Sequence, residues 1–285
     1  MAEKNKAPLS VRGLCKHYPG FDLKDVSFEL EPGTITGFVG RNGAGKTTTL
    51  NSILGFVHPD AGEVRFGGLD MAHDAAQIKA DLGFVSAGMS FYTRKKLSAI
   101  TAVTRSFCPR WDDGAYRRWM ERFGLDEGKT PAALSNGMKI KYALALALSH
   151  GARLFILDEP TSGLDPVSRE ELVEILLALR DEGRTILFST HITGDLEKCA
   201  DRVIYLRKGE VAADMPLQAF ADAWRIVECP GEIPPAVQAA MLGSRRARNG
   251  WTALVPRETD LEPDLTVRVP TLDEIMAHME KEGEA

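Results

Sequence analysis

The segment from Gly40 to Thr47, GRNGAGKT, constrains this chain most, because it fits the pattern G-x-x-x-x-G-K-[ST] at every position. The apolar run Thr34–Val39 before it predicts a buried strand. The pattern after it, Thr47–Leu54, predicts a helix. A strand, a glycine-rich loop and a helix in this order are the context in which the pattern holds phosphate. The sequence therefore predicts an α/β sheet with a phosphate-binding loop at one end.

The chemistry of this loop follows from its glycines. They let the backbone curl so that successive N–H groups face phosphate oxygens, and the next helix presents its positive end to the same anion. We predict that Lys46 reaches the β- and γ-phosphates and that the Thr47 hydroxyl holds Mg²⁺. A glycine-rich turn that binds nothing is the alternative, but the flanking strand and helix argue against it. The predicted nucleotide contacts here are Gly40, Asn42, Gly43, Ala44, Gly45, Lys46, Thr47 and Thr48.

A pair of acids follows a second apolar run. Residues Leu154–Leu157 predict a buried strand, and Asp158 and Glu159 come directly after it. A strand beside the phosphate-loop strand would bring both carboxylates to the metal and the γ-phosphate. Phosphoryl transfer needs positioning and charge neutralisation more than covalent chemistry. We therefore predict that Asp158 orders Mg²⁺, that Glu159 polarises the attacking water, and that Lys46 also assists catalysis.

Composition limits the classes of protein that this chain can represent. Its 285 residues are 44% hydrophobic and 26% charged, which is typical of a folded globular protein. The formal net charge of −5 gives no overall attraction to nucleic acid or to an anionic membrane, so no nucleic-acid partner is expected. The four cysteines are widely spaced, which indicates reduced thiols.

Membrane segments and leader sequences are not predicted. The polar N-terminus has no apolar core after it, so a secretory signal is not expected. The longest apolar stretch, Tyr142–Leu148, is far shorter than the roughly 20 residues of a membrane helix. We expect a soluble protein whose membrane role, if it has one, comes through a partner.

The middle and the end of the chain differ in residue pattern and composition from the part around the loop. Between roughly residues 95 and 149 the pattern is helical, and Tyr116, Trp119, Met120 and Phe123 fall on one face, which predicts a helical insertion. Beyond about residue 216 prolines become frequent, which predicts a small separate unit closed by a helix from Leu272 to about residue 281. The run RRAR at 245–248 is interpreted as a solvated surface.

Three further segments resemble one family. The segment 134–138, LSNGM, resembles the ATP-binding cassette (ABC) signature LSGGQ, and 158–166, DEPTSGLDP, matches the family's acid pair and D-loop. His191 follows the apolar run 185–190 at the place of the family's switch histidine. These segments occur in the family's order. The resemblance covers roughly residues 9–214.

The resemblance implies a fold and a division into domains. The fold is a P-loop NTPase cassette of the α/β class, with a RecA-like core, an antiparallel β subdomain and a helical insertion. It places a nucleotide-binding domain at residues 1–215, with a helical subdomain at about 88–150. A small C-terminal α+β accessory domain at 216–285 is expected in addition.

The resemblance also implies a head-to-tail dimer with two Mg-ATP clamped between the subunits. Ser135 and the Gly137 backbone would then donate to the γ-phosphate of ATP held by the other subunit, and Asp165 of the D-loop is also assigned to the nucleotide. Tyr18 matches the aromatic residue that stacks on adenine. His191 is expected to contact the γ-phosphate and hold Glu159 and the water in line.

Two positions depart from the family's pattern. Asn136 and Met138 replace the first glycine and the glutamine of the signature, which puts the strength of the cross-dimer clamp in question. Ala87 stands where the family's Q-loop has glutamine, and alanine can neither contact the Mg²⁺ shell nor report the γ-phosphate to a partner. Either Ser86 and its neighbours take over this coupling, or nucleotide sensing in this loop is slack.

We therefore expect an ATP-hydrolysing subunit, similar to those of bacterial efflux-type transporters, that drives a separate transmembrane permease. It would be cytoplasmic and lie against the inner face of the cell membrane, as a homodimer or heterodimer of cassettes. The helical insertion around Trp111 and Trp119 would hold part of the docking groove, unless these side chains are packing core. The alternatives are a soluble cassette ATPase acting on a protein or nucleic-acid assembly, and a slowly hydrolysing regulator.

Overall fold

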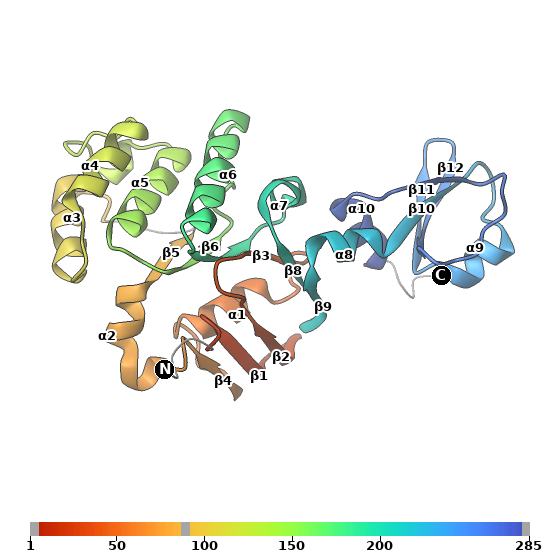
Figure 1. Cartoon of the computed structure of the whole chain (residues 1–285), viewed down its shortest axis with the longest axis horizontal. Coiled ribbons are helices and arrows are strands. Elements are labelled where there is room, and N and C mark those ends of the chain that lie inside the picture. Colours follow the sequence, from red (N-terminus) through yellow and green to blue (C-terminus); the bar gives the residue numbers. More distant parts are fainter. Residues whose placement is uncertain (1–5, 87–91, 281–285) are drawn as a thin grey trace.

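The computed structural model describes residues 6–86 and 92–280, and a six-stranded sheet lies at the centre of the molecule (Figure 1). Its strand order is β5-β6-β7-β3-β8-β9, with β9 alone antiparallel to its neighbour. The strands are β3 (Ile35–Val39), β5 (Leu82–Ser86), β6 (Leu154–Asp158), β7 (Thr185–Ser189), β8 (Arg202–Arg207) and β9 (Glu210–Pro216). The strands expected at 34–39 and 154–157 are thereby confirmed, and the apolar run 185–190 also contains a strand.

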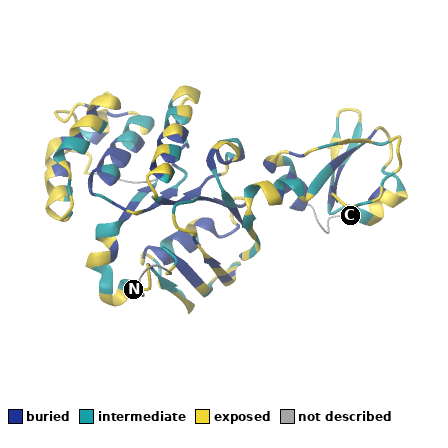
Figure 2. Ribbon diagram, in the orientation of Figure 1, coloured by how far each residue is buried: buried dark blue, intermediate teal, exposed yellow. Residues whose placement is uncertain are grey.

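Both faces of this sheet are buried, which explains why its strands are continuous apolar runs rather than alternating ones. Along β6, Leu154 and Ile156 belong to one hydrophobic cluster, whereas Phe155 and Leu157 belong to the cluster on the opposite face. Figure 2 shows the central strands as the most continuously buried part of the chain.

One face of the large sheet is covered by α1 (Lys46–Ile53) and a three-stranded antiparallel sheet. That sheet has the order β2-β1-β4. Its strands are β1 (Ser10–Tyr18), β2 (Phe21–Glu29) and β4 (Ala61–Arg65). Leu50 and Ile53 of α1 belong to one hydrophobic cluster with apolar side chains of the small sheet and of the large sheet. The small sheet and the helix that follows the phosphate loop therefore share one core.

The opposite face carries the longer helices. They are α5 (Asn136–Ser149), α6 (Pro166–Asp181) and α7 (Thr193–Cys199). The helical insertion continues away from this face with α3 (Leu97–Ser106), α4 (Asp113–Arg122) and the short 3₁₀ turn at Pro131–Ala133, while α2 (Met71–Asp81) leads into β5. In Figure 1 the insertion lies at one end of the molecule.

The C-terminal residues form a third sheet at the other end of the molecule, beyond the connecting helix α8 (Leu217–Asp222) (Figure 1). It is antiparallel with the order β11-β12-β10-β13. Its elements are β10 (Trp224–Cys229), α9 (Pro235–Ala240), β11 (Gly243–Ala247), β12 (Gly250–Pro256), β13 (Thr266–Arg268) and α10 (Leu272–Met279). Ile226, Leu254 and Ile275 belong to the same hydrophobic cluster as the core under the large sheet, so this unit is packed onto the cassette body.

A buried histidine in the C-terminal unit makes folding stability dependent on pH. His278 is 2% exposed, and burial lowers its pKa below the ordinary 6.5. As pH falls below about 6.5, His278 becomes protonated in the unfolded chain while it stays neutral in the folded chain. The free energy of unfolding therefore decreases with a slope of up to about 1.4 kcal/mol per pH unit. Urea unfolding at pH 7.5 and 5.5 should show this loss, and it should be smaller in His278→Gln. An equal loss of stability in the wild type and in His278→Gln would mean that another group causes it, for example His150, which is also buried with a lowered pKa.

Candidate nucleotide site

The phosphate loop connects the end of β3 to the start of α1. Its backbone needs glycine at Gly40, because a Cβ there would lie 2.3 Å from the carbonyl oxygen of Leu206 on β8. Gly43 has a φ of 85°, in the left-handed region that favours glycine. The loop is closed by a hydrogen bond from the Ala44 N–H to the Arg41 carbonyl, 3.0 Å long. The first-turn amides of α1 have no carbonyl partner within the helix, so this end can bind an anion.

Lys46 is the first residue of α1 and is 7% exposed. Its ammonium donates to the carbonyl of Gly40 at 2.5 Å and to that of Arg41 at 3.4 Å. Burial lowers its pKa, while the carboxylates of Glu159 and Asp158 act in the opposite direction. The loop thus supplies a buried cation whose present partners are loop carbonyls that an anion can replace.

Asp158 and Glu159 reach the same place, although the predicted strand arrangement was wrong. β6 does not lie beside β3, because β7 is inserted between them. All three strands are parallel, so their carboxyl ends still meet at one edge of the sheet. Burial raises the pKa of Asp158, and the nearby Glu159 raises it further. The Ser86 hydroxyl donates to its Oδ2 at 3.4 Å.

Glu159 is held in an uncommon conformation. Its φ is 53°, the left-handed region that non-glycine residues rarely adopt. Its N–H donates to the carbonyl of Ser189 at 2.8 Å, which fixes the backbone at the end of β7. Its Oε2 lies 2.6 Å from Nδ1 of His191 and accepts the N–H of the same residue at 3.4 Å. The intervening strand β7 therefore delivers the histidine to the carboxylate.

These side chains surround a cavity of about 570 Å³. It is lined by Phe21, Arg41, Asn42, Gly43, Gly45, Lys46, Thr47, Thr48, Asp158, Glu159 and His191. Of the predicted loop contacts, Gly40 and Ala44 do not line it; Ala44 is buried within the loop. The structure thus brings the loop, both acids and the histidine together in one place.

Two aromatic residues flank the turn between β1 and β2. Tyr18 ends β1 with its ring near the Lys16 ammonium, at 5.7 Å, and it does not line the cavity. Phe21, its partner across the Tyr18-Pro19-Gly20-Phe21 turn, does line it. The sequence signal that could have identified Phe21 is this Pro-Gly turn, which places two aromatic residues opposite each other.

The signature residues lie elsewhere in the same chain. Ser135 caps α5 by accepting the N–H of Met138 at 3.2 Å. Gly137 is packed so closely that a Cβ would lie 3.1 Å from the Leu164 side chain of the D-loop. Asp165 caps α6, accepting the N–H of Ser168 at 3.0 Å. None of these residues lines the cavity, so one chain by itself presents the phosphate loop and the acids without the signature.

The residues of the cavity fit Mg²⁺ with a nucleotide. Mg²⁺ is usually held in such sites by one or two protein oxygens together with substrate phosphates and water. The exposed Thr47 side chain and Asp158 line the same cavity and supply that donor set. Within residues 6–86 and 92–280 no group of three or more His, Cys, Asp or Glu residues could hold a metal by itself. Ala87, expected at the Q-loop position, lies outside the described residues.

Comparison with known proteins relates the chain to one family. The sequence profile of the ABC transporter family matches residues 23–162. The chain is 28% identical to the ABC transporter ATP-binding protein YtrB of Bacillus subtilis over 76% of its own length and 74% of YtrB. It is 33% identical to the probable multidrug ABC transporter ATP-binding protein YbhF of Escherichia coli, over 73% of this chain and 37% of YbhF. ATP-binding cassette sub-family A member 7 of Rattus norvegicus is 34% identical over 71% of this chain, which spans only 10% of that protein.

Solved structures share the fold. An ATP-binding subunit of an ABC transporter superposes with a TM-score of 0.68 at 28% identity, over 74% of this chain and 90% of that one. A dimeric ATP-binding cassette bound to ADP and Pi superposes with a TM-score of 0.64 at 24% identity, over 73% and 98%. With the phosphate loop, the acids and the histidine at one sheet edge, these likenesses lead to one assignment. The chain is a member of the ATP-binding cassette (ABC transporter) family and carries that family's ATP-binding cassette.

Proposed function

We propose that this chain binds Mg-ATP and hydrolyses it as one half of a two-cassette sandwich that drives a separate transmembrane subunit. The observation that carries the proposal is the convergence of Lys46, Asp158, Glu159 and His191 on one cavity. A buried cation, a carboxylate that can hold Mg²⁺ and a carboxylate paired with an imidazole supply the positioning and charge neutralisation that ATP hydrolysis needs.

Different groups of the chain bind the phosphates, hold the metal and act on the attacking water in this proposal. The loop amides and Lys46 hold the phosphates, while Thr47 and Asp158 hold Mg²⁺, which when bound neutralises charge on the β- and γ-phosphates. Glu159 accepts the proton of the attacking water, because its carboxylate is the general base within reach of the cavity. His191, 2.6 Å from that carboxylate, keeps it oriented. Phe21 supplies an aromatic surface at the cavity wall.

A second cassette completes the site in this proposal. Ser135, Gly137 and Asp165 do not line the cavity of their own chain, so the signature must come from a partner to act there. Val167, two residues after Asp165 at the start of α6, is 78% exposed. An apolar side chain exposed at this place is consistent with a face that a partner covers. The dimeric arrangement of the ADP-bound structural relative is consistent with this.

The membrane partner is proposed to dock on α3. Val103 lies on α3 and Phe107 is the residue directly after its last turn, and their side chains are 58% and 79% exposed. Much of this helix is exposed in Figure 2. Adjacent exposed apolar side chains of this size mark interaction surfaces. Trp111 and Trp119 pack against the core instead, beside Tyr116 and Phe123. No helix of the described chain is both long and apolar enough to cross a bilayer. The location proposed for the protein, at the cytoplasmic face of the membrane, rests on its docking to that partner.

A capture experiment tests the transport proposal. Tagged Glu159→Gln is expressed in native cells, locked with Mg-ATP, purified from gently solubilised membranes and compared with Lys46→Ala by mass spectrometry. A polytopic membrane protein enriched with the locked form is the expected result, and Val103→Asp with Phe107→Asp should reduce its recovery. Recovery of only ribosomal proteins, nucleic acid or soluble chains would refute transport in favour of a soluble cassette ATPase.

A further inference from the structure

The segment after the switch histidine connects the nucleotide site to the rest of the molecule. His191 is followed within two residues by α7, and the Thr190 hydroxyl accepts the Ile192 N–H at 2.9 Å, which makes the junction tight. Thr190 is fully buried. A shift of α7 therefore moves the backbone of His191 relative to Glu159.

α7 is itself seated on the strand that leads into the phosphate loop. Leu196 is fully buried, and its side chain packs on Gly37 of β3 so closely that a Cβ there would lie 2.9 Å from it. On its other side, Lys198 forms an ion pair with Glu170 of α6. The position of this short helix is thus set by its neighbours, because a helix of seven residues has little stability by itself.

The C-terminal unit supplies one of these neighbours through α10. The N–H of Leu272, in the first turn of α10, donates to Oε1 of Glu197 on α7 at 2.6 Å. First-turn amides lack partners within their own helix, and a carboxylate at this end is favoured by the helix dipole. At the other end of α10, the buried Tyr205 of β8 donates to Glu280 at 2.9 Å. Both ends of α10 are therefore attached to the cassette.

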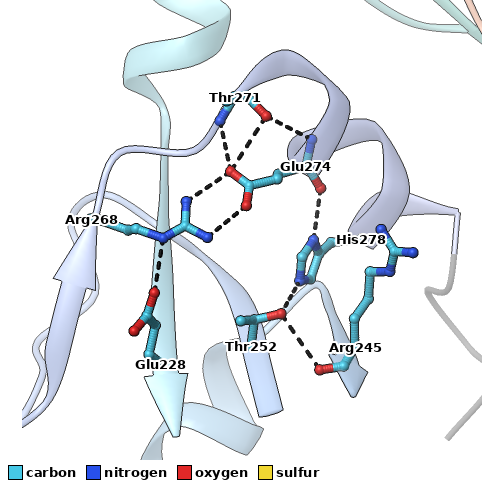
Figure 3. Close-up of polar contacts among 7 residues, drawn as sticks. All are labelled: Glu228, Arg245, Thr252, Arg268, Thr271, Glu274 and His278. Carbon is cyan, nitrogen blue, oxygen red and sulfur yellow. Dashed lines mark hydrogen bonds and ion pairs between the residues drawn. The ribbon is translucent and has the colours of Figure 1, made fainter. Parts of the chain in front are cut away.

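α10 is held firmly by its own unit, as Figure 3 shows. Arg268 of β13 donates to both oxygens of Glu274, at 2.8 and 2.6 Å, and to Glu228 of β10 at 3.0 Å. Thr271 and Glu274 form a reciprocal cap over the first turn. His278 contacts the Thr252 hydroxyl of β12 at 3.1 Å. The turn that carries the Leu272 amide is consequently the best-supported part of the helix.

We infer that the C-terminal unit positions the switch histidine through α10 and α7, with Glu197 as the positioning residue. The inference rests on the proposed role of His191 in ATP hydrolysis. Within its described part, up to residue 280, the C-terminal unit contributes no residue to the lining of the nucleotide cavity, so the unit acts on the alignment of Glu159 and His191 and not on nucleotide contacts. This gives the C-terminal unit a part in turnover that is separable from ATP binding.

Glu197→Ala tests this in the full chain. We expect kcat for ATP hydrolysis to fall about three- to tenfold, with the Kd for Mg-ATP unchanged within about twofold. Glu197→Gln should restore kcat, because its amide oxygen can still accept the Leu272 N–H. Asp273→Ala, which removes an exposed carboxylate from the same turn of α10, is the matched control and should behave like wild type. The imidazole NMR resonances of His191, assigned by their loss in His191→Ala, should shift in Glu197→Ala and return in Glu197→Gln.

The outcomes separate the inference from the proposed function. Wild-type protein that binds but never hydrolyses ATP would overturn the proposed function itself. Hydrolysing wild type together with wild-type kcat and unshifted His191 resonances in Glu197→Ala would overturn only the inference. An equal fall of kcat in Glu197→Ala and Glu197→Gln would also count against it, because glutamine keeps the acceptor oxygen and the loss would then come from the charge and not from the hydrogen bond to Leu272. A parallel loss of ATP affinity would count against it as well.

Discussion

Replacing Lys46 with alanine is expected to abolish measurable ATP binding. The ammonium is buried and lies within 3.4 Å of two loop carbonyls, and phosphate oxygens of a bound nucleotide would take over these donors. Each charge-assisted hydrogen bond contributes about 1.5–3 kcal/mol, so losing two of them weakens affinity by about 10²–10⁴-fold. Isothermal titration with Mg-ATP measures the loss directly.

The same substitution is informative about the fold. Burial lowers the pKa of Lys46, so the charged group is held at a cost, and its removal should not reduce thermal stability by much. Lys79→Ala, which removes an exposed lysine at the last turn of α2, is the matched loss of charge and should bind like wild type. ATP binding by Lys46→Ala with wild-type affinity would mean that the phosphates lie outside the loop.

Replacing Glu159 with glutamine should leave ATP binding intact and reduce turnover by about 10²–10⁴-fold, the range for loss of a general base. Glutamine has nearly the same shape and meets the same backbone constraint at a φ of 53°, so the fold of the site is retained. Its amide cannot accept the proton of the attacking water. Phosphate release under saturating Mg-ATP gives the rate.

This variant also tests the two-cassette arrangement. With hydrolysis blocked, Mg-ATP should hold two chains together, and light scattering after gel filtration should show twice the monomer mass with ATP and the monomer with ADP. Glu182→Gln, at the exposed end of α6, is the matched control and should turn over like wild type. Wild-type turnover in Glu159→Gln would exclude this carboxylate as the base, and hydrolysis by a strict monomer would exclude the sandwich.

Local sequence patterns predicted individual elements of the core well. The strand before the loop, the helix after it and the acid-ended strand β6 are short-range features, in which apolar periodicity and glycine placement decide the backbone. The meeting of Lys46, Asp158 and Glu159 at one cavity was also predictable, because each is adjacent to its strand or loop along the chain. The aromatic residue of the cavity was not, since Tyr18 and Phe21 differ only in which side of a turn they occupy.

By itself, then, the sequence determined the groups that one stretch of backbone positions: the phosphate loop, the acid pair and the histidine at the end of their strands. Only the tertiary structure decided what depends on contacts between distant segments. It inserted β7 between β3 and β6, which is why His191 meets Glu159 at 2.6 Å. It also placed α10 against α7 through Leu272 and Glu197, 75 residues apart in the chain. Strand order and helix docking are set by packing of whole faces, and packing leaves no local pattern in the sequence.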